Sequence, residues 1–142
     1  MHSIHPIIGS LIRRGLWPVG ELNPLSVEVV QSVAPGEDRL CLSAPENFRT
    51  VKSEAELGVP EFWKKYGALS ELDSARALII GDFGLGSDAP IVIDSDFRIQ
   101  DPRVMRLAWG VFEGGAKTCW VTFFERLSEF AAFLETHLRP NA

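Results

Sequence analysis

Residues 77–94, ALIIGDFGLGSDAPIVID, decide the fold class of this chain of 142 residues. Two apolar runs, Ala77–Ile80 and Ile91–Ile93, are bounded by glycine, proline and aspartate, which is typical of short buried strands. The segment GDFGLGSDAP between them is about as long as a connection between neighbouring antiparallel strands. The stretch therefore predicts two such strands side by side in one sheet.

Helices are expected at both ends of the chain, because apolar residues recur there at helical spacing. The first helix precedes Gly15, and the last one carries its apolar residues on a single face. The residues concerned are Ile4, Ile7, Ile8, Leu11 and Ile12 in the first helix, and Leu127, Phe130, Ala131, Leu134 and Leu138 in the last.

Further strands are expected over residues 39–43, 48–52, 104–109 and 118–124, and a short helix is expected to begin at Pro60. Residues 21–36 fit either a strand or a helix. The order of these elements predicts an α+β fold: a single domain over residues 1–142, with a largely antiparallel sheet packed against the N-terminal and C-terminal helices.

Composition narrows the function classes. The net charge of −5 argues against a nucleic-acid binder, which would need a basic surface. The first residues, MHSIHPIIGSLIRR, lack the features of a signal peptide, and no stretch approaches the roughly 20 apolar residues of a membrane span. We therefore expect a cytoplasmic protein without a membrane partner.

The glycine-rich segment after residue 80 contains Gly84-x-Gly86-x-x-Ala89, a spacing that resembles a dinucleotide fingerprint. That motif requires a following helix, whereas Pro90 and a β-branched run follow here. We expect Gly81, Gly84 and Gly86 to adopt positive φ angles in a tight connection instead. The letters Asp82-Phe83-Gly84 lack the other kinase motifs, so no cofactor is predicted.

Acidic residues concentrate between Gly81 and Asp101. This segment holds five aspartates and one arginine, Arg98, which gives a local net charge of −4. The aspartates are Asp82, Asp88, Asp94, Asp96 and Asp101. Two interpretations stand side by side: the aspartates cap turns and strand ends, or they form an acidic surface that recognises a basic partner.

No histidine or cysteine predicts a metal site or a catalytic residue. His2, His5 and His137 lie near the ends of the chain without a third ligand at metal spacing. Cys41 and Cys119 are expected to be reduced core residues.

The tryptophans are predicted to divide between core and surface. Trp63, Trp109 and Trp120 lie in apolar segments and are expected to pack in the core. Trp17 stands next to Pro18, and we expect it to be partly exposed on a binding surface.

Several of these segments together resemble the SUKH superfamily, and more narrowly its Smi/Knr branch. The resemblance rests on a strand ending in Ile80-Gly81, the acidic loop with Gly84 and Gly86, the DPRVMRLAW segment, a second tryptophan strand and an aromatic C-terminal helix. The motif residues in these last segments are Pro102, Trp109, Trp120 and Phe130, and the match covers residues 39–138.

The resemblance implies an α+β fold and a role in protein binding without catalysis. Bacterial members are similar to immunity proteins, which bind and neutralise a toxin domain, often a nuclease. A basic nuclease groove would complement an acidic face. We therefore expect Asp82, Asp88, Asp94, Asp96, Asp101 and Trp17 to face the partner. Two alternatives remain open: a regulatory adaptor, and a small-ligand-binding or hydrolytic domain that uses residues 81–90.

Overall fold

The computed structural model describes residues 4–17, 25–57, 72–83, 89–96, 98–108 and 119–138. Within these residues, six strands form one antiparallel sheet in the order β1-β3-β4-β5-β6, where β1 is Cys41–Leu42, and β2 (Arg49–Thr50) also pairs with β3. The long strands are β3 (Ala77–Asp82), β4 (Pro90–Asp94), β5 (Val104–Ala108) and β6 (Cys119–Phe124). The α+β fold expected from the sequence is therefore confirmed, including the antiparallel pairing of residues 77–82 with residues 90–94.

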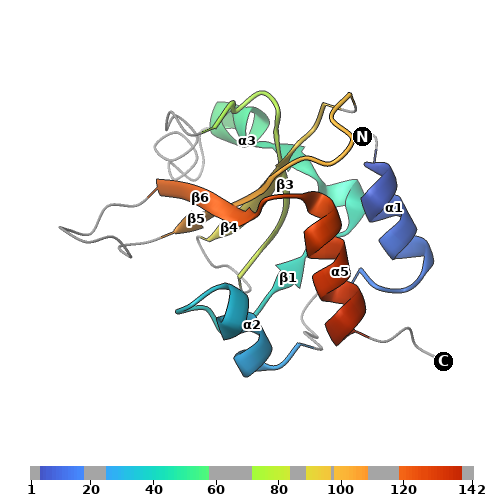
Figure 1. Ribbon diagram of the computed structural model, residues 1–142. Helices are drawn as coiled ribbons and strands as arrows, with labels where there is room; N and C mark the ends of the chain where they lie inside the picture. Colours follow the sequence, from blue (N-terminus) through green and yellow to red (C-terminus); the bar gives the residue numbers. More distant parts are fainter. Residues whose placement is uncertain are drawn as a thin grey trace.

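Two helices from opposite ends of the chain lie side by side. Helix α1 (Pro6–Arg13) and helix α5 (Leu127–His137) pack against each other and against one face of the sheet (Figure 1). The α1 helix begins where the ring of His5 accepts a hydrogen bond from the Ile7 amide, and it ends before Gly15, whose φ angle is +71°. Both terminal helices predicted from the apolar spacing are confirmed.

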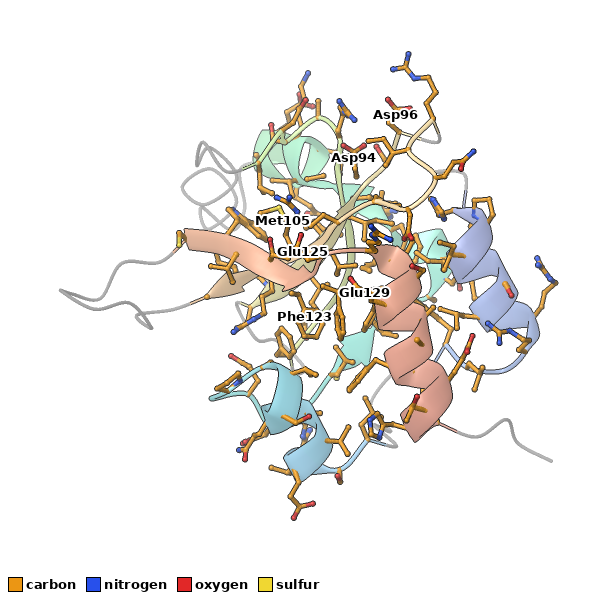
Figure 2. All side chains as sticks on the ribbon, in the orientation of Figure 1. Asp94, Asp96, Met105, Phe123, Glu125 and Glu129 are labelled. Atoms are coloured by element: carbon orange, nitrogen blue, oxygen red, sulfur yellow. The ribbon has the colours of Figure 1, made fainter. Side chains whose placement is uncertain are left out.

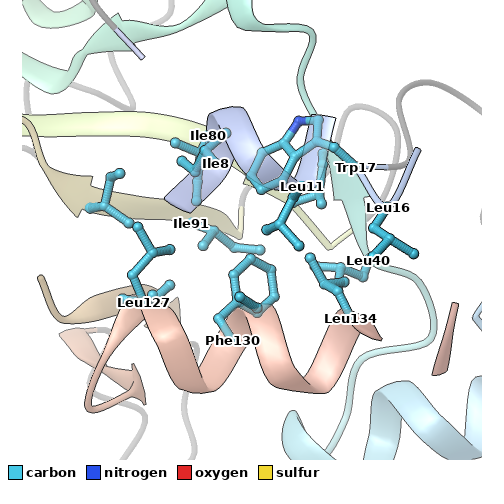
Figure 3. Close-up of a cluster of buried hydrophobic side chains, with 14 of the residues drawn as sticks. Ile8, Leu11, Leu16, Trp17, Leu40, Ile80, Ile91, Leu127, Phe130 and Leu134 are labelled. Atoms are coloured by element: carbon cyan, nitrogen blue, oxygen red, sulfur yellow. The ribbon is translucent and has the colours of Figure 1, made fainter. Parts of the chain in front are cut away.

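The main core lies between these helices and the sheet. Figure 3 shows Leu127, Phe130 and Leu134 projecting from α5 toward Ile91 and Leu11. Alternate residues of β3 and β4, namely Leu78, Ile80, Ile91 and Ile93, supply the sheet side of this core. The period of two in a strand explains why the remaining residues of the same strands face the other way.

A second, smaller core lies on the opposite face of the sheet. It contains Ala77, Val92, Leu107 and Trp120, together with Val51 from helix α3 (Val51–Leu57). The sheet is therefore covered on one face by α1 and α5 and in part on the other by α3. Trp120 is 3% exposed, so its predicted core position is confirmed.

The N-terminal third of the sheet differs from expectation. The strand expected over 39–43 is only β1 (Cys41–Leu42). The strand expected over 48–52 is β2 (Arg49–Thr50), which follows the 3-10 turn η1 (Pro45–Asn47) and leads directly into α3. The Ser53 amide donates a hydrogen bond to Thr50 Oγ1, and the Ser53 hydroxyl donates one to the Thr50 carbonyl. These hydrogen bonds lie at the start of α3, where a longer strand was expected.

The ambiguous segment 21–36 contains a helix, α2 (Val27–Val33). The Ser26 hydroxyl accepts a hydrogen bond from the Val29 amide and so caps the first turn. A positive φ angle of 91° at Gly36 follows soon after the helix ends. The cap, which β-branched propensity does not register, is a local feature that favours the helix.

Gly81 corrects a prediction about the glycine-rich segment. Its φ angle is not positive; instead, β1 approaches it so closely that a Cβ would collide with the Cys41 carbonyl and lie 3.1 Å from Leu42 Cα. Glycine is needed here for strand packing, not for turn geometry. Gly84, Gly86, Trp63, Trp109 and the helix predicted at Pro60 lie outside the described residues.

Candidate functional site

A groove of about 380 Å³ crosses one face of the sheet, at the end where β3 begins and β4 ends. Its apolar floor includes Val92 and Met105, which are directly paired across β4 and β5, and Ala77 of β3. The other apolar residues of the lining are Leu72, Ile93, Ile99 and Pro102. The described residues that line the groove all lie outside the 81–90 segment.

Six charged side chains surround this floor. Four are carboxylates and two are guanidinium groups, so the rim is acidic overall. They are Asp73, Arg76, Asp94, Asp101, Arg103 and Glu125. Figure 2 shows Met105 close to Glu125, with Asp94 farther along the same end of the sheet. Two of the aspartates predicted to face a partner, Asp94 and Asp101, therefore line the groove.

Arg76 largely neutralises the first part of this rim. Its Nη2 lies 2.6 Å from Asp94 Oδ2, and its Nε donates to Asp94 Oδ1 at 3.1 Å. The same guanidinium lies 3.6 Å from Asp96. Arg98 donates to Oδ1 and Oδ2 of Asp96, and these hydrogen bonds hold the pKa of Asp96 at about 2. Two of the predicted recognition aspartates are thus matched by two arginines.

Asp101 is occupied in a different way. Its Oδ1 accepts a hydrogen bond from the Ser128 amide at 2.8 Å, and its Oδ2 accepts one from the Ser128 hydroxyl. Burial alone would raise the pKa of Asp101, but the two hydrogen bonds from Ser128, together with the charges of Arg126 and His5, outweigh it and the pKa is lowered. Arg126, the N-cap residue of α5, makes no side-chain cap, and Asp101 supplies that cap from the connection between β4 and β5.

The predicted acidic residues do not form one surface. Asp82 pairs with Pro90 and Asp94 pairs with Ala77, so the two aspartates lie at opposite ends of the β3–β4 pair. The five residue steps along β3 from Ala77, the partner of Asp94, to Asp82 correspond to roughly 16 Å. Asp82 and Asp94 belong to one acidic stretch of sequence, but the strand pairing places their charges far apart in space. Asp88 lies outside the described residues.

Asp82 instead belongs to a second group of charges around Arg106. Arg106 is 9% exposed, and its guanidinium carbon lies 5.7 Å from the centre of the Phe83 ring. Burial lowers the pKa of Arg106, and the charge of Glu37 opposes this effect. Burial also raises the pKa of Glu37, to which the nearby carboxylates of Asp38 and Asp82 contribute.

Trp17 is buried, which corrects the prediction that it is partly exposed. Its side chain is 7% exposed, and its indole N–H donates to the Ser43 carbonyl at 2.9 Å. The ring packs edge-on against Phe48 and Phe130 at centroid distances of 6.2 and 6.4 Å. These neighbours are distant in sequence, so the Trp17-Pro18 context alone did not indicate burial.

Three residues that line the groove were not predicted from the sequence as site residues: Asp73, Arg76 and Glu125. Each lies outside the conspicuous acidic segment, and strand pairing brings them to the groove. The capping role of His5 was not predicted either. Its buried ring caps α1, and its Nε2 lies 3.3 Å from the Ile99 carbonyl oxygen. A histidine directly before Pro6 at the first helical position was the available signal for this cap.

Two kinds of feature are absent from the part of the chain that the structure describes. No group of three or more histidine, cysteine, aspartate or glutamate side chains there is arranged to hold a metal ion. None of the helices in those ranges is long and apolar enough to cross a membrane.

Comparisons with known proteins add no relative to this picture. No family model, curated protein or solved structure matches the chain.

Proposed function

We propose that this chain is a protein-binding domain of the SUKH type, which acts as a cytoplasmic immunity protein against a basic toxin domain. The observation that supports the proposal best is the groove at the β3–β4 end of the sheet. An apolar floor bordered by more carboxylates than guanidinium groups suits a partner that presents both apolar and cationic side chains.

The charge distribution also supports a basic partner. The chain carries a net charge of −5, and the rim of the groove has four carboxylates against two guanidinium groups. Complementary charge raises the rate of association and selects against acidic partners. Arg76 pairs with Asp94 and Arg98 pairs with Asp96, so these two carboxylates are already neutralised by arginines. Asp73 and Glu125 therefore remain as the rim carboxylates that are best able to bind a cationic side chain of the partner.

Co-expression with a toxin tests this function. If the proposal holds, a toxin domain is encoded beside the gene of this chain; that domain is expressed in a bacterial host, with and without the chain, and growth is followed. We expect the chain to restore growth and to elute with the toxin domain as one complex in size-exclusion chromatography. Absence of both effects with a folded chain would refute the proposed function.

Ionic strength provides a second, independent readout. If charge complementarity contributes to the complex, raising the salt concentration should slow association more than it accelerates dissociation. Surface plasmon resonance at several salt concentrations measures both rates. An association rate that does not change with salt would contradict the role assigned to the acidic rim.

A further inference from the structure

The carboxylates with acceptor capacity to spare are Asp73 and Glu125, which adjoin β3 and β6 on opposite sides of the groove in the strand order. Asp73 accepts a hydrogen bond from the Ala75 amide through Oδ1, and within the described residues it makes no ion pair. Glu125 is approached by Arg103 at 3.7 Å, and the two side chains are 71% and 57% exposed. By contrast, both oxygens of Asp94 are held by Arg76.

The strand order separates these two carboxylates by a predictable distance. Asp73 precedes β3, where its carbonyl accepts the Ala77 amide, and Glu125 directly follows β6. Three strand-to-strand steps separate β3 from β6. At about 4.8 Å for each step, β3 and β6 lie about 14 Å apart, so we expect a separation of about this size between the two ends of the groove.

The floor between these ends is apolar. Val92 on β4 and Met105 on β5 are paired, so their side chains lie side by side on the face that carries the groove. Val92 is buried and Met105 is partly buried against the smaller core. An unbranched methionine side chain adapts to the shape of an apolar group placed on it.

An extended peptide has matching dimensions. Its residues i and i+4 point to the same side and are about 13 Å apart, and residue i+2 lies between them on that side. From this match we propose that the groove binds an extended segment with basic residues at i and i+4 and an apolar residue at i+2. The inference rests on the proposed function, since it specifies which part of a basic partner the groove recognises.

Each position of such a segment has a named counterpart. The basic residue at one end meets Asp73, and the basic residue at the other meets Glu125, in competition with Arg103. The aliphatic stems of lysine or arginine can lie on the apolar lining while their charged ends reach the rim. The apolar residue at i+2 contacts Met105, the partly exposed residue of the Val92–Met105 pair. An acidic segment would place its charges against the same carboxylates and would be rejected.

Fluorescence anisotropy with synthetic peptides tests the spacing. One fluorescein-labelled Gly/Ser peptide carries lysines at i and i+4 with leucine at i+2; a second has the same composition with adjacent lysines. We expect the full chain to bind the spaced peptide about fivefold or more tightly than the second at low ionic strength. Equal affinity for the two peptides, or no detectable binding of the spaced one, would overturn the inference.

Charge-neutralising variants locate the binding. Asp73→Asn with Glu125→Gln should remove the preference for the spaced peptide. The control, Glu28→Gln with Glu129→Gln, removes the same formal charge from exposed positions on α2 and α5 and should keep it. A preference that survives in the first variant, or is lost equally in both, would refute the groove as the site.

Growth rescue separates this inference from the function on which it rests. If the wild-type chain restores growth and the Asp73→Asn, Glu125→Gln variant does so equally, the groove assignment is wrong while the proposed function stands. If the wild-type chain neither restores growth nor forms a complex, the proposed function fails whatever the peptides show.

Discussion

The guanidinium of Arg76 forms an ion pair with the carboxylate of Asp94 where β3 begins and β4 ends. Nη2 lies 2.6 Å from Oδ2, and Nε donates to Oδ1 at 3.1 Å, so the contact is bidentate. Since Ala77 and Asp94 are directly paired, the antiparallel register sets this contact. The acidity of residues 81–101 is therefore offset by an arginine that lies outside that segment.

A double-mutant cycle should detect this contact. The side chains of Arg76 and Asp94 are 43% and 29% exposed, and bidentate geometry favours the upper part of the range for such pairs. We expect a coupling energy of about 0.5–1 kcal/mol between Arg76→Gln and Asp94→Asn in urea unfolding. The cycle of Arg103→Gln with Glu125→Gln, whose groups are 3.7 Å apart, should give a smaller value. Equal coupling in both cycles would contradict the geometry.

Asp96 should titrate well below an ordinary aspartate. The Arg98 hydrogen bonds lower its pKa from 3.8 to about 2 in the folded state. Because the folded pKa is below the unfolded one, the stabilisation is present above about pH 4 and is lost as pH falls toward 2. Carboxyl NMR should give a midpoint of about 2, and Arg98→Gln should shift it upward. A midpoint that stays in place in this variant would show that Arg98 is not the cause.

Asp101→Ala should destabilise the fold through α5. The variant removes the acceptor for the Ser128 amide and hydroxyl, and loss of a helix cap costs about 1 kcal/mol. Asp101→Asn keeps an oxygen that can accept the amide, so it should cost less. Urea unfolding measures both variants. A larger loss for asparagine than for alanine would contradict the capping role.

Gly81→Ala should be more harmful than an ordinary glycine substitution. The new Cβ would collide with the Cys41 carbonyl on β1, and forced overpacking costs roughly 1–3 kcal/mol. Gly9→Ala is the control, since its Cβ would meet Arg13 Nη1 at 3.4 Å and alanine is the better helix former. Thermal unfolding should place Gly81→Ala below the wild type and Gly9→Ala at or above it. Equal stability of both variants would refute the close approach.

The two cysteines should react at different rates and should not form a disulfide with each other. Cys41 on β1 is 9% exposed, and its burial raises its thiol pKa, with a further contribution from Asp82. Cys119 on β6 is partly exposed, at the other edge of the sheet. Four strand spacings, about 19 Å, separate the two edges, which exceeds disulfide reach. Thiol titration of the native protein should show Cys119 reacting first. Equal rates would contradict the difference in burial between the two thiols.

Local pattern was sufficient for the long elements. The apolar runs at 77–80 and 91–93 and the helical spacing near both termini specify their own secondary structure, because side-chain period selects strand or helix. It was insufficient where elements are short. In the segment 48–52, the neighbouring β-branched residues Thr50 and Val51 fall in different elements. Thr50 ends β2, which pairs with β3, and Val51 begins α3.

The sequence by itself determined the fold class, the main core and the acidic balance of the chain, because these depend on the kinds and spacing of residues along it. Only the tertiary structure decided where the charges act. Antiparallel pairing carries Asp82 and Asp94 to opposite ends of two strands and joins Asp94 to Arg76. It also brings Asp73 and Glu125 to one groove and buries Trp17 against Phe48 and Phe130. The physical reason is that electrostatic and packing energies depend on distance in space, which sequence separation does not fix.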